Sequence, residues 1–134
     1  MPSSFDYAVV RIVPAVEREE FFNAGVILFC PEQRFLGARV YLDRKKLKAF
    51  APELEPEEMQ RRLEGIEKIC AGDPSAGTIA QLGERARFHW LIAPRSTMVQ
   101  VSPTHSGICE EPRSALDRLF YEQVLSPAKL QDSV

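Results

Sequence analysis

The chain has 134 residues, of which 45% are hydrophobic and 27% charged, and its formal net charge is −2 at pH 7. This composition is typical of one globular domain and excludes an intrinsically disordered chain, which lacks the apolar residues needed to build a core. The charge also lacks the basic excess with which nucleic-acid-binding domains neutralise phosphates, so nucleic acid is not an expected partner.

Three strands are predicted at the start of the chain. β-branched and aromatic side chains dominate residues 5–13, 23–30 and 35–42. The connection at residues 31–34 is short enough for a hairpin, and the one at residues 14–22 is also local. We therefore expect these strands to form an antiparallel meander.

Two helices are predicted next. Residues 44–50 form a short helix capped by Asp43. Residues 55–70 carry the clearest helix signals, because Pro56 stands in the first turn, two glutamates follow it, and apolar residues recur at helical spacing. Gly72 follows this segment and is expected to end the helix.

The remaining segments are less uniform. Residues 78–93 combine helical spacing with an alternation typical of a strand, and we favour the helix. Residues 97–101 predict a fourth strand, and residues 112–125 predict a helix that ends before Pro127. Residues 127–134 are expected to form a loose tail.

Together these elements predict an α+β fold. We expect an antiparallel sheet of about four strands, made of the three-stranded N-terminal meander plus one later strand, packed with three or four helices. Residues 1–134 are predicted to form a single domain, with an ordered core at residues 5–126.

The cysteines indicate the compartment. Cys30, Cys70 and Cys109 are widely spaced and odd in number, which fits neither a disulfide framework nor a zinc motif. No window approaches the ~20 apolar residues needed to span a bilayer, and the N-terminus does not resemble a signal peptide. We therefore predict a cytoplasmic protein with no membrane partner.

The polar segment at residues 94–109 is the first candidate site. A guanidinium, several hydroxyl groups and an imidazole are the groups that hold a phosphate or a carboxylate. The candidate ligand-binding residues are Arg95, Ser96, Thr97, Gln100, Ser102 and His105. The alternative is that Arg95 makes a structural ion pair and that the serines serve as turn residues.

Evidence for catalysis or for a cofactor is weaker. His105 and Cys109 are candidates for a nucleophile and its base, but they lie four apart in an expected loop, where spacing fixes no geometry. No catalytic residue is therefore assigned. The chain holds no zinc, calcium, Walker or dinucleotide motif, so no metal and no cofactor is expected.

The predicted sheet offers a second candidate site. Direct antiparallel pairing places Leu28 and Leu36 on one face, which is expected to carry the helices. The opposite face presents Phe29, Phe35 and Tyr41. That face is either covered by a second helix or exposed as a protein interface, in which case these three are the partner-binding residues. A slip of one residue would exchange the faces.

Four segments of the chain stand out when they are taken together. They are Y-A-V-V-R-I-V-P at residues 7–14, E-R-E-E-F-F-N-A-G-V-I-L-F-C at 17–30, R-F-H-W-L-I-A-P-R-S-T at 87–97 and S-P-T-H-S-G-I-C at 102–109. In combination they resemble the bacterial family catalogued as domain of unknown function 3037. The resemblance covers nearly the whole chain and implies a shared fold and a bacterial source, but it assigns no catalytic or binding residue.

The resemblance also implies a partner. It suggests a neighbouring gene for a HipA-like serine/threonine kinase, and hence a regulatory or accessory role. The first hypothesis for function is a small non-enzymatic module that binds another protein. The alternative is an enzyme or a small-anion binder that uses residues 95–109.

Overall fold

The computed structural model describes residues 2–15, 20–94 and 97–125 of the chain. Within these residues the centre is an antiparallel sheet. Strand β1 pairs with β2 along one edge and with both β4 and β5 along the other, and β3 lies outside β2. The strands are β1 (Ser3–Ala15), β2 (Glu20–Cys30), β3 (Phe35–Val40), β4 (Val99–Val101) and β5 (His105–Cys109).

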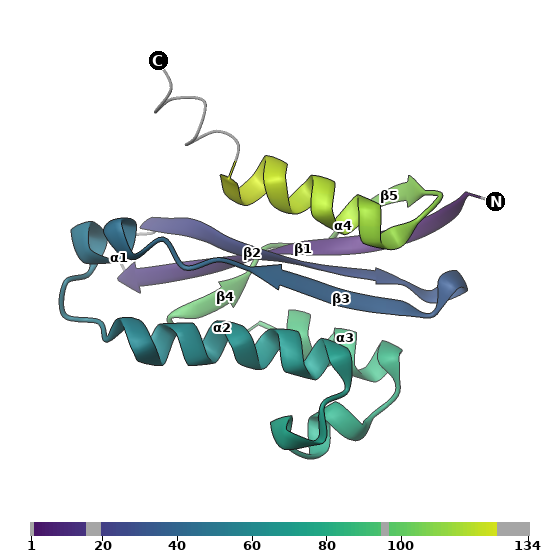
Figure 1. Cartoon of the computed structure of the whole chain (residues 1–134), viewed down its shortest axis with the longest axis horizontal. Coiled ribbons are helices and arrows are strands. Elements are labelled where there is room, and N and C mark those ends of the chain that lie inside the picture. The colour runs from purple at the N-terminus through teal and green to yellow at the C-terminus, as the bar shows by residue number, and fades with distance from the viewer. Residues whose placement is uncertain (1, 16–19, 95–96, 126–134) are drawn as a thin grey trace.

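Helices cover both faces of this sheet (Figure 1). Helices α2 and α3 lie against one face, α4 lies against the other, and α1 closes one end. Their bounds are α1 (Arg44–Phe50), α2 (Pro56–Ala71), α3 (Glu84–Ile92) and α4 (Pro112–Phe120). A short 3₁₀ turn at Pro31–Gln33 joins β2 to β3, and two more, Pro74–Ala76 and Thr78–Gln81, lie between α2 and α3. A π turn, Tyr121–Leu125, extends α4.

The predicted α+β class and the N-terminal meander are confirmed. The cap of α1 is also confirmed, because the Asp43 carboxylate accepts hydrogen bonds from the backbone N–H groups of Lys45 and Lys46, each at 3.1 Å. Residues 84–92 form a helix, as favoured over a strand. The predicted tail at residues 127–134 lies outside the described residues.

The sequence does not predict strand β5, because His105–Cys109 is polar and typical of a loop. The strand forms because β1 has 13 residues, whereas β4 pairs with only Val10–Ile12 of it. The rest of that edge of β1 would otherwise have unpaired N–H and C=O groups. Residues Ser3 to Tyr7 of β1 are instead paired with β5.

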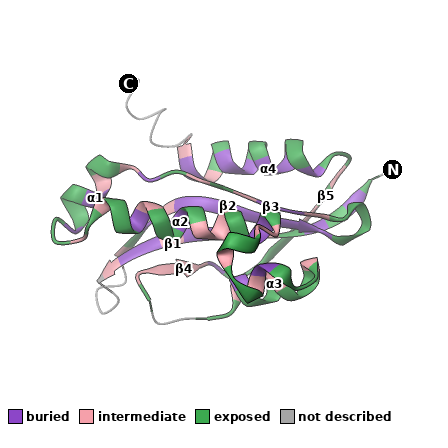
Figure 2. Cartoon of the chain, turned by 60° about the horizontal axis from the view of Figure 1, so that its bottom comes forward, coloured by how far each residue is buried: buried purple, intermediate pink, exposed green. Residues whose placement is uncertain are grey.

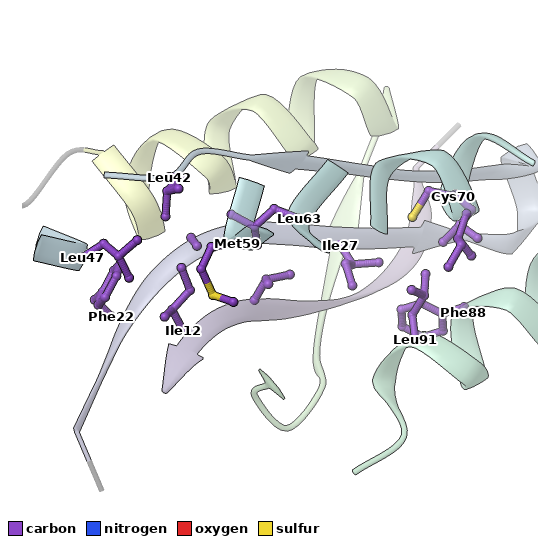
Figure 3. Packing of buried hydrophobic residues seen from close by; sticks show 14 of the residues in the cluster. Ile12, Phe22, Ile27, Leu42, Leu47, Met59, Leu63, Cys70, Phe88 and Leu91 are labelled. Carbon is purple, nitrogen blue, oxygen red and sulfur yellow. The ribbon is translucent and has the colours of Figure 1, made fainter. Parts of the chain in front are cut away.

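Two apolar clusters fill the space between the sheet and its helices. The larger joins Ile12 and Ile27 of the sheet to Met59 and Leu63 of α2 and to Phe88 of α3 (Figure 3). The smaller joins strand residues such as Val26 and Leu28 to Leu116 and Phe120 of α4. Figure 2 shows buried residues along the strands and exposed residues on the outer sides of α1 and α4. The sheet is therefore the middle of three layers.

Of the two alternatives for the second sheet face, the structure shows the covered one, and the expected register of the third strand is wrong. Phe29 pairs with Leu36, so these two side chains share a face. Simple alternation instead places Leu36 with Leu28 on the opposite face. The turn at Pro31–Gln33 offsets the hairpin by one residue, which is enough to exchange every side chain of β3 between the faces.

The three predicted partner-binding residues consequently do not share one surface. Phe29 is only 3% exposed, and its ring packs against Phe88 with the centroids 5.1 Å apart. Phe35 is half-buried on the other face, under the guanidinium of Arg113. Tyr41 follows β3 and is 47% exposed. A covering helix, the alternative to an exposed face, explains why Phe29 belongs to the core.

The burial of Phe29 makes a stability prediction. Phe29→Ala should lower the free energy of unfolding by about 3–5 kcal/mol, because it removes a buried ring and leaves a cavity between the sheet and α3. Tyr41→Ala, a control from the same predicted set, should change it by less than about 0.5 kcal/mol. Urea unfolding followed by circular dichroism measures both values. Equal effects of the two substitutions would contradict the assigned face.

Candidate functional site

A groove with a volume of about 260 Å³ lies between α2, α3 and β4. Helix α2 supplies Arg62, Gly65, Ile66 and Ile69, which are spaced so that they share one face of the helix. The facing wall comes from Trp90 and Leu91 of α3 and from Ala93 just after it, and the last side comes from Thr97, Val99, Gln100 and Val101. These residues together define the groove.

Gly65 is the most unusual residue in the groove. It is the only glycine inside a described α-helix, where glycine destabilises by about 1 kcal/mol relative to alanine. A Cβ built on Gly65 would lie within 4 Å of no described residue beyond its two chain neighbours and the backbone of its own helix. The absence of a side chain at this position therefore opens the groove without being required by the packing of the described residues.

Two glycines of the sheet have a clear steric reason. A Cβ on Gly37 would lie 2.7 Å from the ring of Phe35, and one on Gly107 would lie 2.5 Å from the ring of Phe5. Aromatic rings cross the backbone at both of these sheet positions, so only glycine fits there. Gly65 has no such neighbour, which separates it from the glycines that the sheet needs.

The apolar walls of the groove merge with the core. Leu91 is 4% exposed and Ile69 is 9% exposed, whereas Trp90 is 38% exposed at the rim. Val99 and Val101 pair with Ile12 and Val10 of β1, so their side chains lie on the face of the sheet that α2 and α3 cover. An apolar group that entered the groove would therefore extend the core contacts of α2 and α3.

Arg62 is the one charged residue among the described groove residues. Its Nη2 lies 3.4 Å from Oε1 of Glu58, one turn earlier on α2, and the two side chains are 41% and 48% exposed. An ion pair this long and this exposed adds little to stability. The guanidinium therefore stands at one end of an apolar groove without a strong partner in the described residues.

Two of the sequence-predicted ligand residues reach the groove. Thr97 and Gln100 both line it, but their side chains are hydrogen-bonded to nearby backbone carbonyls. Oγ1 of Thr97 donates to the carbonyl of Val99 at 2.6 Å, and Nε2 of Gln100 donates to the carbonyl of Thr97 at 2.8 Å. Arg95 and Ser96 lie outside the described residues. The structure thus brings Thr97 and Gln100 together at one end of β4.

Ser102 has a structural role instead. It is buried, and its Oγ accepts a hydrogen bond from the N–H of Val9 at 2.9 Å while donating one to the carbonyl of Pro103 at 2.8 Å. The hydroxyl stands in for a backbone acceptor at the point where the chain leaves β4. Both of its hydrogen-bonding functions are occupied by the backbone, which explains its burial.

His105 lies apart from the other candidates. It pairs with Tyr7, whereas Gln100 pairs with Arg11, so four residues of β1 separate them and the distance along the strand is about 13 Å. Its ring packs against Tyr7 with centroids 5.3 Å apart. One small anion could not contact both Gln100 and His105, and an anion site that includes Arg95 stays a prediction.

The geometry also separates His105 from Cys109. They stand four residues apart along β5, again about 13 Å, so the imidazole cannot take a proton from the thiol. Burial raises the pKa of the Cys109 thiol, and the neighbouring Cys30 thiol raises it further. An activated nucleophile requires a lowered pKa, so this pair has neither the geometry nor the electrostatics for nucleophilic catalysis.

The described residues show no further class of site. They contain no group of three or more His, Cys, Asp or Glu side chains that could hold a metal ion. None of the described helices is long and apolar enough to cross a membrane. Sequence reasoning misses the groove because its walls come from three separate segments, although a glycine inside a strong helix pattern is a visible signal.

Comparison with known proteins gives one match. A family model described as "Protein of unknown function (DUF3037)" matches residues 7–124, which is most of the chain. No curated protein and no solved structure matches. The matched range contains all four helices, all of β2 to β5 and every groove residue.

The burial of the three thiols predicts the order in which they are alkylated. Cys70 is 4% exposed, and burial raises its pKa to about 12, so only about one thiol in 10⁴ is ionised at pH 8. Cys30 is fully buried. Iodoacetamide at pH 8 should therefore alkylate Cys109 first, and Cys30 and Cys70 only after unfolding, as mass spectrometry of timed digests would show.

A disulfide would contradict this arrangement. Cys30 and Cys109 lie on β2 and β5, which flank β1 from opposite sides, and both thiols are free. Equal alkylation of all three thiols in the native protein would also show that the described burial is wrong.

Proposed function

We propose that this chain, which belongs to the DUF3037 family, is a non-enzymatic protein-binding module whose partner inserts apolar side chains into the groove between α2, α3 and β4. The HipA-like serine/threonine kinase implied by the family resemblance is the first candidate partner. The role would then be regulatory or accessory.

The observation that carries this proposal is the open space at Gly65. A glycine in the middle of a 16-residue helix lowers helix stability, and no side chain of the described residues fills the space it leaves. A residue that weakens the helix and serves no internal contact is explained if another molecule uses the space. The space opens onto the groove, beside Ile66 and Ile69.

The composition of the groove favours a protein partner. Tryptophan is enriched in protein interfaces, and Trp90 presents 38% of its surface at the rim. The groove is slightly smaller than the roughly 300–1,000 Å³ of typical small-molecule pockets, and it is partly open to solvent. An apolar groove of this size suits one or two anchoring side chains of a partner.

The alternative function, an enzyme or small-anion binder that uses residues 95–109, has less support. Of its described candidate residues, only Thr97 and Gln100 lie together, and His105 stands on another strand. The described groove also lacks a histidine, cysteine or carboxylate that could act as a base or nucleophile.

Filling the groove from within tests the proposal. Gly65→Leu should abolish co-purification of the partner, because the new side chain occupies the space in which the partner would bind. The same change should leave the melting temperature equal or higher, since leucine is a better helix former than glycine. Partner recovery is measured by affinity purification from the native host followed by mass spectrometry. A direct binding assay with the HipA-like kinase is the second measurement.

Two matched variants control the experiment. Gly65→Ala should stabilise the fold by about 1 kcal/mol and weaken partner binding only moderately, because a methyl group fills little of the groove. Ala49→Leu adds the same apolar side chain to an exposed position of α1, outside the groove, and should leave partner recovery unchanged. Full recovery of the partner with Gly65→Leu would refute the groove as the binding site.

A further inference from the structure

We infer that the partner segment bound in this groove carries a carboxylate beside its apolar anchor, and that Arg62 is the residue that selects it. The inference rests on the proposed function, because it assigns the chemistry of the segment that the groove would bind.

The spacing on α2 places the charge next to the open space. Arg62 lies three residues before Gly65 and four before Ile66, so the three share one face of the helix. Helical side chains point toward the N-terminus of their helix, and the contact of Arg62 with Glu58 follows that direction. The groove is therefore apolar at Ile66 and Ile69 and cationic at its Arg62 end.

The guanidinium has capacity for a further acceptor. Arginine carries five N–H donors, and the long contact with Glu58, at 3.4 Å, uses only one nitrogen of Arg62. A carboxylate from the partner could accept two parallel hydrogen bonds from this fork, in a groove that the apolar anchor has partly cleared of water. Glu58 does not line the groove, so its long contact with Arg62 leaves the groove free for the partner's carboxylate.

The same arrangement rejects the opposite charge. A lysine or arginine of the partner at this end would meet a guanidinium that lies beside apolar walls, where the repulsion is less screened than in bulk water. A neutral amide would gain hydrogen bonds but no charge attraction. The order of preference at this position is therefore acidic, then neutral, then basic.

Three synthetic peptide pools serve as probes. Each pool contains acetylated, amidated hexapeptides with Leu, Ile or Phe at alternate positions, and at one fixed position either Glu, Gln or Lys. Trp90 is the only tryptophan of the chain and lies at the rim of the groove, so its emission reports binding in titrations of the whole protein. We expect the Glu pool to bind about fivefold or more tightly than the Gln pool, and the Lys pool to bind least.

Two variants locate the effect. Arg62→Gln should reduce the affinity of the Glu pool at least to that of the Gln pool, because it removes the guanidinium and leaves the carboxylate of Glu58 without this cationic neighbour. Arg61→Gln removes the same charge from the neighbouring exposed position, outside the groove, and should leave the Glu preference intact. Gly65→Leu should abolish binding of all three pools.

Several results would overturn the inference. Equal binding of the Glu and Gln pools would do so, and so would a Glu preference that survives Arg62→Gln or disappears in Arg61→Gln. Failure of all pools to bind would also overturn it. The proposed function is judged separately, because it falls only if the native partner is still recovered with Gly65→Leu.

Discussion

The antiparallel pairing of β1 on both of its edges is the constraint on which the rest of the structure depends. β2 pairs with one edge, while β4 and β5 divide the other between Val10–Ile12 and Ser3–Tyr7. The division falls at Ser102, whose hydroxyl accepts the N–H of Val9 where the backbone turns away. The pairing with β4 and β5 joins residues 87 to 106 positions apart and brings β4 under α2 and α3. Without it the groove would have only two walls.

A sheet that is apolar on both faces requires cover on both, and the helices supply it unevenly. The run Ala24–Cys30 of β2 is buried at every position, and from Val26 to Cys30 its residues alternate between the two clusters. Where the helices end, arginines lie over the rings at the margin of the core. The guanidinium-to-ring distances are 4.2 Å for Arg11 on Phe21, 4.3 Å for Arg39 on Phe120, 5.1 Å for Arg113 on Phe35 and 5.4 Å for Arg85 on Phe29.

Local signals in the sequence predict local structure, and long-range pairing decides the rest. The Asp43 cap, the meander and the helix at Pro56–Ala71 depend on residues close in sequence, and all three are confirmed. The face assignment of Phe29 fails because a one-residue offset in a short turn cannot be derived from alternation alone. β5 is not predicted because its polar residues form a strand only by pairing with the edge of β1 that β4 leaves free. The groove combines three distant segments, so no window of sequence contains it.

Helix α3 lacks a clear amphipathic pattern because two of its sides carry apolar residues. Its sequence is ambiguous because apolar residues alternate through Phe88, Trp90 and Ile92, which is a strand pattern. In the structure Phe88 and Leu91 form the buried stripe, while Trp90 lies off that stripe and lines the groove. A helix with the core on one side and the apolar groove on another carries apolar residues on both, and its amphipathic period is lost. Gly65 in α2 is the complementary case, where a residue poor for the helix leaves space on the same groove. The two departures from helical pattern thus meet at the same groove, which is the observation on which the proposed function depends.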